Sequence, residues 1–256
     1  MKFTHQSDTF IEIDSAKIYF EEIGTPQKQP LLFLHGGFGN IEDFNGIIPL
    51  LKNEYRIIGI DSRGQGKSTL GNKALTYARI EKDIEVIIKQ LNLVNPVILG
   101  FSDGGISALR LTSSNSLKVD KLIVIGSSWH SKSLANSKSF LEAITTEKWK
   151  ERFPETYEQY QNLNVDPDFD KLTKAMVKMW IDETSTGHPD ETVQNINCPT
   201  LIIRGDNDHL CSKQSSFELS ELIKDADFAN IPFCGHEVFN DQKNILMEMV
   251  NQFLVQ

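Results

Sequence analysis

The stretch Val97-Ile98-Leu99-Gly100-Phe101-Ser102-Asp103-Gly104-Gly105-Ile106-Ser107-Ala108-Leu109 decides the fold of this chain of 256 residues. An apolar, β-rich run meets a Gly-x-Ser-x-Gly core and continues into a segment whose apolar residues recur with helical spacing. This order predicts a strand, a sharp turn at Ser102 and a helix, with flanking glycines because bulkier side chains would not fit. We therefore expect the Ser102 hydroxyl to be exposed at the carboxyl end of a strand; the alternative is an ordinary glycine-rich loop with an incidental serine.

Strand and helix patterns alternate on both sides of this stretch. Apolar runs at residues 30–34, 55–60 and 121–126 are typical of strands buried on both faces, and residues 44–51 and 77–91 have helical periodicity. The alternation predicts an α/β fold with a mostly parallel, doubly wound sheet and right-handed crossovers. The other expected elements are an antiparallel hairpin at 9–13 and 17–23, strands at 199–204 and 226–231, and helices at 217–223 and 245–254.

The β pattern stops in the middle of the chain. Residues 128–197 contain helical patterns and many aromatic and sulfur-containing side chains, so we expect a helical lid inserted into a core of residues 1–127 and 198–256. Such a lid would line an apolar pocket above the serine, where Trp129 and Phe38 are expected to contact substrate. The alternative is that these side chains only attach the insertion to the sheet.

Composition excludes several classes of function. The formal net charge is −9, and without a basic stripe neither nucleic-acid nor anionic-membrane binding is expected. Hydrophobic residues make up 39% of the chain, which is ordinary for a globular protein and argues against disorder. The three cysteines have neither disulfide nor metal-ligand spacing, so we expect them to be buried and reduced, with no metal or organic cofactor implied.

Two further features bear on location and on nucleotide binding. No apolar run reaches membrane-spanning length and the N-terminus lacks the apolar stretch of a secretion signal, so a cytoplasmic protein is expected. The loop at residues 61–68 superficially resembles a phosphate cradle, but its glycine spacing does not match a P-loop. We instead expect Asp61 and Arg63 to brace a turn beside the serine loop.

Three chemically matched residues each follow a predicted strand. A serine needs a base to remove its proton, and the base needs a carboxylate to fix its tautomer. The chain supplies Ser102, Asp208 and His236 in that order, with Asp206 as a competitor for the carboxylate. The glycine-rich loop at 35–39 can offer a backbone N–H to an oxyanion, and its histidine is expected to orient the loop.

The chain resembles members of the α/β-hydrolase superfamily. Five motifs resemble its signatures in their usual order: His35-Gly36-Gly37, Asp61-x-Arg63-Gly64-x-Gly66-x-Ser68, Gly100-x-Ser102-x-Gly104, Gly205-x-x-Asp208 and Gly235-His236. The resemblance implies the α/β-hydrolase fold, with a sheet of about eight strands and a helical lid. It also implies that Ser102 is the nucleophile, His236 the general base and acid, and Asp208 its carboxylate partner.

The resemblance extends to the oxyanion hole and to one branch of the superfamily. The backbone N–H of Asp103 and that of Gly37 or Phe38 would bind the oxyanion, a choice the sequence leaves open. The run from Gly100 to Leu109 is similar to that of valacyclovir-hydrolase-like enzymes, which cleave α-amino acid esters. Asp103 would then pair with a substrate ammonium group; the alternative is that it caps the helix start.

The sequence predicts a serine hydrolase that cleaves a small carboxylic ester, or an α-amino acid ester, through an acyl-enzyme. A small-molecule ester is the expected partner, and the protein is expected to be a monomer or homodimer. Three alternatives remain: a carbon–carbon bond hydrolase or lactonase with the same triad, a cofactor-free haloperoxidase-type perhydrolase, and a ligand-sensing signalling protein on the hydrolase fold.

Overall fold

A computed structural model describes residues 2–51 and 55–256, except for the side chains of residues 134–136. Its strands form one eight-stranded sheet in the order β1-β2-β4-β3-β5-β6-β7-β8. The strands are β1 (Phe10–Ile13), β2 (Ala16–Ile23), β3 (Gln29–Leu34), β4 (Tyr55–Ile60), β5 (Val97–Phe101), β6 (Lys121–Ile125), β7 (Thr200–Gly205) and β8 (Ala226–Ile231).

The sheet is antiparallel at one edge and parallel elsewhere. β1 pairs with β2 and β2 with β4 in antiparallel fashion, whereas β4, β3, β5, β6, β7 and β8 are parallel neighbours. β5 lies near the middle, with β3 on one side and β6 on the other. The predicted opening hairpin and doubly wound parallel sheet are confirmed, and the chain turns at Ser102 from a central, buried strand.

Helices cover both faces of the sheet. The α-helices are α1 (Tyr77–Gln90), α2 (Asp103–Ser113), α3 (Lys138–Glu142), α4 (Thr146–Arg152), α5 (Pro154–Leu163), α6 (Phe169–Trp180), α7 (Lys213–Leu222), α8 (Val238–Asp241) and α9 (Lys243–Leu254). The 3₁₀ helices are η1 (Ile41–Gly46), η2 (Ile48–Leu50), η3 (Ser131–Asn136) and η4 (Asp190–Asn195). Residues 44–51, expected to be one helix, instead fall in η1 and η2, where Pro49 lies at the start of η2.

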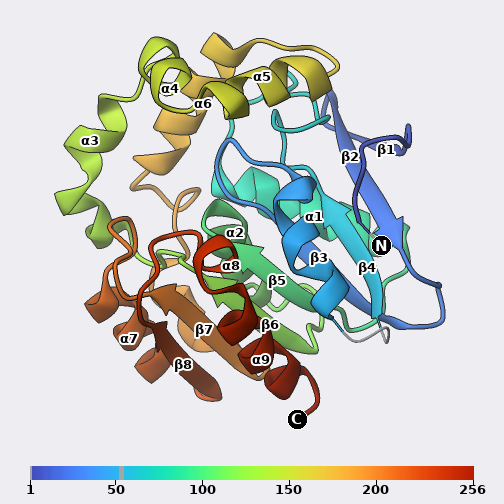
Figure 1. Ribbon diagram of the computed structural model, residues 1–256, viewed down its shortest axis with the longest axis vertical. Coiled ribbons are helices and arrows are strands. Elements are labelled where there is room, and N and C mark those ends of the chain that lie inside the picture. Colours follow the sequence, from blue (N-terminus) through green and yellow to red (C-terminus); the bar gives the residue numbers. More distant parts are fainter. Residues whose placement is uncertain (1, 52–54) are drawn as a thin grey trace.

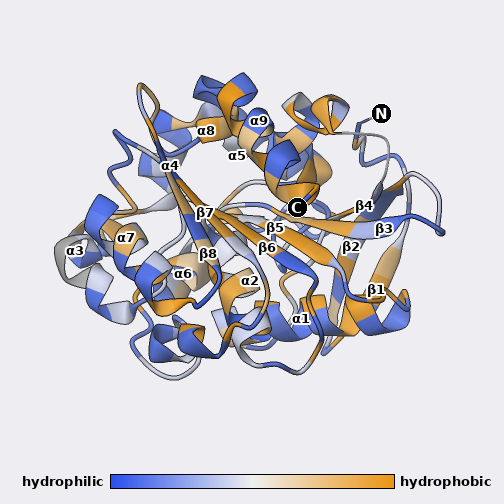
Figure 2. Ribbon diagram, turned by 90° about the horizontal axis from the view of Figure 1, so that it is seen from below, coloured by the Kyte–Doolittle hydropathy of each residue, from blue (hydrophilic) through white to orange (hydrophobic). Residues whose placement is uncertain are grey.

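Successive side chains of each strand point to opposite faces of the sheet, so the hydrophobic core has one part on each face. In β3, Leu32 and Leu34 pack with the apolar side of α1 and α2, whereas Leu31 and Phe33 pack with η1, α8 and α9. Figure 2 shows α1 and α2 on one side of the sheet and α8 and α9 on the other. The three cysteines are free and buried, as predicted.

A helical segment joins β6 to β7. We use this name for η3 to η4, residues 131–195, in which the described residues form helices and connecting turns but no strand. Figure 1 shows α4, α5 and α6 grouped together at the top of the view, far from α9 and the C-terminus. Within this segment, α4 is a short helix whose N-terminus is capped by the Thr145 side chain.

No helix in residues 2–51 and 55–256 combines the length and the apolar character needed to cross a bilayer.

Candidate active site

The turn after β5 holds Ser102 in a strained backbone conformation. Ser102 has φ 50° and ψ −118°, and α2 begins at the next residue. The turn brings strand and helix so close that a Cβ on Gly100 would lie 2.6 Å from the carbonyl oxygen of Gly104. A Cβ on Gly104 would in turn collide with the carbonyl oxygen of Leu34 on the neighbouring strand. The expected strand, turn and helix are therefore present, and glycine is required on both sides of Ser102.

Three loops at the carboxyl ends of β5, β7 and β8 bring Ser102, Asp208 and His236 together. His236 Nε2 lies 3.0 Å from Ser102 Oγ, and His236 Nδ1 lies 2.8 Å from Asp208 Oδ2. Asp206 lies elsewhere: its Oδ1 accepts hydrogen bonds from Asn230 and Lys213. Of the two carboxylates that follow β7, Asp208 is thus the one that contacts the histidine.

The environment of Asp208 favours its charged form. Burial alone would raise its pKa, but the contact with His236 and the backbone N–H groups of Leu210 and Cys211 lower the pKa of Asp208 below its usual value. A charged carboxylate only accepts hydrogen bonds, so His236 carries its proton on Nδ1. Nε2 is then free to accept the proton of the Ser102 hydroxyl.

The loop after β3 lies directly against the serine. A Cβ on Gly36 would lie 3.2 Å from the Ser102 Cβ, and Phe38 has a left-handed backbone with φ 58°. The loop closes with a hydrogen bond from the Gly39 N–H to the Gly36 carbonyl. Gly37 lies against Asp103, the first residue of α2, since a Cβ on Gly37 would lie 2.7 Å from Asp103 Oδ2.

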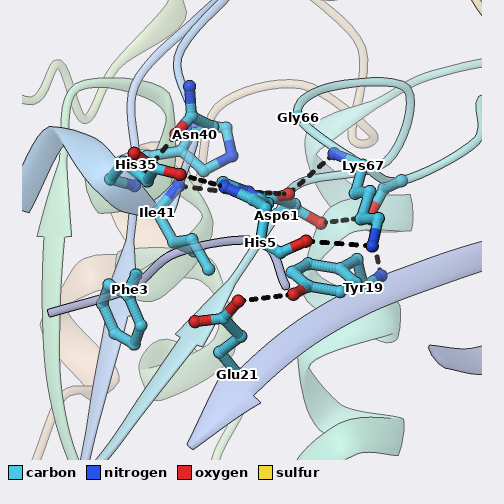
Figure 3. Close-up of polar contacts among 12 residues, drawn as sticks. Phe3, His5, Tyr19, Glu21, His35, Asn40, Ile41, Asp61, Gly66 and Lys67 are labelled. Carbon is cyan, nitrogen blue, oxygen red and sulfur yellow. Dashed lines mark hydrogen bonds and ion pairs between the residues drawn. The ribbon is translucent and has the colours of Figure 1, made fainter. Parts of the chain in front are cut away.

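Buried polar side chains fix this loop to the end of β4. His35 Nε2 accepts the Ser62 N–H, so Nδ1 carries the ring proton and donates to the Gly36 carbonyl at 2.7 Å. Burial lowers the pKa of His35, which keeps the ring neutral. Asp61, fully buried, accepts the backbone N–H groups of Ile41 and Lys67 (Figure 3). His35 therefore orients the loop as predicted, and Asp61 braces both this loop and its own.

His5 completes this network, although no local pattern in the sequence pointed to it. The N-terminal segment places its ring between two carboxylates. Nε2 lies 2.8 Å from Asp61 (Figure 3), and Nδ1 lies 2.7 Å from Glu42. The ring also stacks on Tyr19. Burial alone would lower the pKa of His5, but the two carboxylates raise it to about 9. A positive charge on His5 therefore offsets the buried charge of Asp61 at neutral pH.

We expect the His5→Gln variant to be less stable than wild type at pH 7 by about 2 kcal/mol, because glutamine keeps a hydrogen bond but removes the charge. The pKa of His5 in the folded protein, about 9, lies above its ordinary value of 6.5. The positive charge of His5 therefore stabilises the folded protein fully below pH 6.5, and this contribution is lost as the pH rises through 9. Urea unfolding of both proteins at pH 7 and about pH 10 measures the difference. An equal difference at both pH values would contradict the assignment.

A cavity of about 860 Å³ opens over the serine. Its floor includes Ser102 and His236, and the helical segment supplies apolar groups such as Phe140, Trp149 and Trp180. Phe38 is part of this wall, with ring-centroid distances of 4.2 Å to Trp149 and 5.5 Å to Trp180. The expected apolar pocket between the sheet and the helical segment is therefore present, and Phe38 lines it.

Trp129 occupies a different place from the one expected. It is not among the described residues that line the cavity. Its indole N–H donates to the Ser215 carbonyl at 2.8 Å, and its ring packs edge-on against His130. Trp129 follows β6 closely and its hydrogen bond to Ser215 holds it against α7, so it fastens the start of the helical segment to the core.

The Asp103 carboxylate accepts hydrogen bonds from two side chains that lie far from it in the sequence. The Tyr77 hydroxyl donates to Oδ1 at 2.6 Å, and the Trp180 indole N–H donates to Oδ2 at 2.8 Å. Among the described hydrogen bonds of its carboxylate, none goes to a backbone N–H at the start of α2, the alternative role that the sequence left open. Burial raises the pKa of Asp103, although the hydrogen bonds from Tyr77 and Trp180 lower it in part. Asp103 therefore ties α1 and α6 to the serine turn.

Among the described residues, no cluster of histidine, cysteine and acidic side chains has the arrangement of a metal site.

Known proteins resemble this chain over most of its length. A family model described as alpha/beta hydrolase fold matches residues 29–169, which is more than half of the 256 residues. The AB hydrolase superfamily protein YisY of Bacillus subtilis is 27% identical over 92% of this chain and 94% of its own length.

Two further relatives have more specific names. A 2-hydroxy-6-oxo-6-(2'-aminophenyl)hexa-2,4-dienoic acid hydrolase of Metapseudomonas resinovorans is 23% identical, covering 90% of this chain and 84% of its own. The solved structure of the esterase EaEST from Exiguobacterium antarcticum matches with a TM-score of 0.77 and 27% identity, covering 97% of this chain and 99% of that one.

Proposed function

The chain belongs to the alpha/beta-hydrolase family, and from that premise we propose that it is a serine hydrolase that cleaves a small carboxylic ester through an acyl-enzyme. The observation that carries this proposal is the chain of contacts from Asp208 through His236 to Ser102 on the floor of an apolar cavity. The similarity to an esterase of known structure supports an ester as the substrate class.

In the proposed reaction Ser102 Oγ attacks the ester carbonyl carbon while His236 Nε2 takes the hydroxyl proton. The negative charge that develops on the carbonyl oxygen is stabilised by the backbone N–H of Asp103 and by that of Gly37 or Phe38. Collapse breaks the bond to the alcohol oxygen, which receives the proton from His236. Water then attacks the acyl-enzyme by the same route, with His236 as base, and releases the acid and the free serine.

We assign the role of a substrate-selecting lid to residues 128–197, with residues 1–127 and 198–256 as the catalytic core. The apolar side chains of the helical segment that line the cavity support this assignment. They would hold the acyl or alcohol group of the substrate and exclude water from the serine.

Recognition of an α-amino ester by Asp103 receives little support from the contacts of that side chain. Both of its oxygens accept hydrogen bonds, from Tyr77 and Trp180, and burial raises its pKa. A substrate ammonium group would have to displace one of these donors. A neutral ester is therefore the substrate class that we propose.

The first test is hydrolysis of p-nitrophenyl acetate and butyrate, together with labelling by a fluorophosphonate that reacts with activated serines. We expect turnover, and a labelled peptide that contains Ser102, because only an activated hydroxyl displaces fluoride from phosphorus. Absence of turnover on every ester, with labelling at Ser102, would favour a narrow carbon–carbon hydrolase or lactonase. Absence of both would leave the ligand-sensing alternative.

A further inference from the structure

His188 is a second histidine in the wall of the active-site cavity, and the triad does not use it. It follows α6, and its side chain lines the same cavity as Ser102. Only 4% of His188 is exposed. The segment that carries it is fixed, because Arg110 donates to the carbonyl oxygens of Gly187 and His188.

The His188 ring is not satisfied by its surroundings. Its buried Nδ1 has no hydrogen-bond partner within residues 2–51 and 55–256. The ring packs edge-on against Tyr77, with the centroids 5.3 Å apart. Buried polar atoms without partners are rare in folded proteins and cost free energy, so this one requires an explanation. His188 lies in the wall of the cavity, so a turn of its ring would bring this buried nitrogen to a bound ligand.

The neighbouring polar groups are already paired. The Tyr77 hydroxyl and the Trp180 N–H are both directed to Asp103, and the two Asp103 oxygens accept them. Among the described residues that line the cavity, His188 Nδ1 and the Trp149 indole N–H are the buried side-chain groups left without a partner, and only the histidine can both donate and accept. Burial lowers the pKa of His188 to about 4, so the ring is neutral at physiological pH and can both donate and accept a hydrogen bond.

We propose that His188 is a specificity-determining residue that binds an uncharged hydroxyl or oxo group of the substrate, so that the preferred ester carries such a group near the scissile bond. This inference rests on the proposed function, because it names the substrate class of the same cavity. A neutral imidazole suits an uncharged polar group of the substrate. A charged substrate group would be buried beside His188 without a counter-ion. Sites that hydrogen-bond a substrate group discriminate strongly against analogues that lack it.

The test compares ethyl butyrate with two hydroxylated esters, ethyl 3-hydroxybutyrate and 2-hydroxyethyl butyrate. The first carries the hydroxyl on the acid and the second on the alcohol, so the pair distinguishes the two sides of the scissile bond. We expect wild type to prefer one hydroxylated ester in kcat/KM. His188→Leu should reduce that preference, taken as the ratio of kcat/KM to that for ethyl butyrate, by about 10-fold, and His188→Gln should restore part of it.

His130→Gln is the matched control. His130 is also a buried histidine near the helical segment, but both of its ring nitrogens have partners, in Glu191 and the Lys132 N–H. This variant should keep the wild-type preference. Equal losses on all three esters in His188→Leu, or no preference in wild type, would overturn the inference while leaving the proposed function intact. No Ser102-dependent turnover of any ester would instead overturn the proposed function itself, and the inference with it.

Discussion

Ser102→Ala is expected to lower kcat for ester hydrolysis by at least about 10⁴-fold and to leave the fold intact. The hydroxyl is the group that forms the acyl-enzyme, and the variant retains only binding and the oxyanion donors. Alanine has the same Cβ as serine, so the strained backbone at φ 50° is no harder to form. Steady-state hydrolysis of p-nitrophenyl butyrate measures the loss, and circular dichroism and thermal unfolding check the fold.

Ser107→Ala provides the control for this variant. Ser107 is a buried serine in α2, the helix that follows Ser102, and its hydroxyl donates to the Asp103 carbonyl at 3.0 Å. Its removal tests whether any loss of a buried hydroxyl near the turn reduces activity, and we expect a change of less than about 10-fold. Comparable losses in both variants, or substantial turnover by Ser102→Ala, would contradict the role of Ser102 as nucleophile.

Asp208→Asn should have an effect of similar size, about 10⁴-fold in kcat. The asparagine side chain would offer an amide N–H to His236 Nδ1, and that favours the tautomer with the proton on Nε2. Nε2 could then no longer accept the proton of Ser102, whose Oγ lies 3.0 Å away. The substitution preserves shape, so KM for p-nitrophenyl butyrate should change much less than kcat.

Asp206→Asn separates the role of Asp208 from a general effect of charge. Both carboxylates follow β7, but Asp206 binds Asn230 and Lys213 at the surface, whereas Asp208 is the partner of His236. We expect the kcat of Asp206→Asn to stay within about 3-fold of wild type. A large loss in Asp206→Asn with little loss in Asp208→Asn would reverse the assignment made from the geometry.

Much of the fold follows from local patterns in the sequence. The buried runs that form β3, β5 and β6 are continuous and apolar because both of their faces are covered by helices. Parallel strands place their carboxyl ends at one edge, so residues 102, 208 and 236 meet even though each lies on a different loop. The choice of Asp208 over Asp206 rests on family spacing, and the hydrogen bond to His236 agrees with it.

What the sequence did not reveal depends on contacts between distant segments. His5 lies 56 residues from Asp61, and Trp180 lies 77 residues from Asp103. Neither contact follows from a periodic pattern or a motif, so a local signal for these contacts does not exist. The place of Trp129 could not be predicted for a related reason: an aromatic side chain in an insertion can pack against the core or line a pocket, and only its neighbours decide which.

The hydrogen bond between Trp180 and Asp103 also limits how this enzyme can be re-engineered. Exchanging the helical segment for that of a relative is an obvious route to new substrates. Such a graft would remove the Trp180 indole N–H, so that a buried Asp103 oxygen beside the nucleophile would lose its hydrogen-bond donor. We expect this to lower the free energy of unfolding by about 1–3 kcal/mol. The segment is therefore not an interchangeable module: a chimera must bring its own donor to that position or replace Asp103 together with the graft.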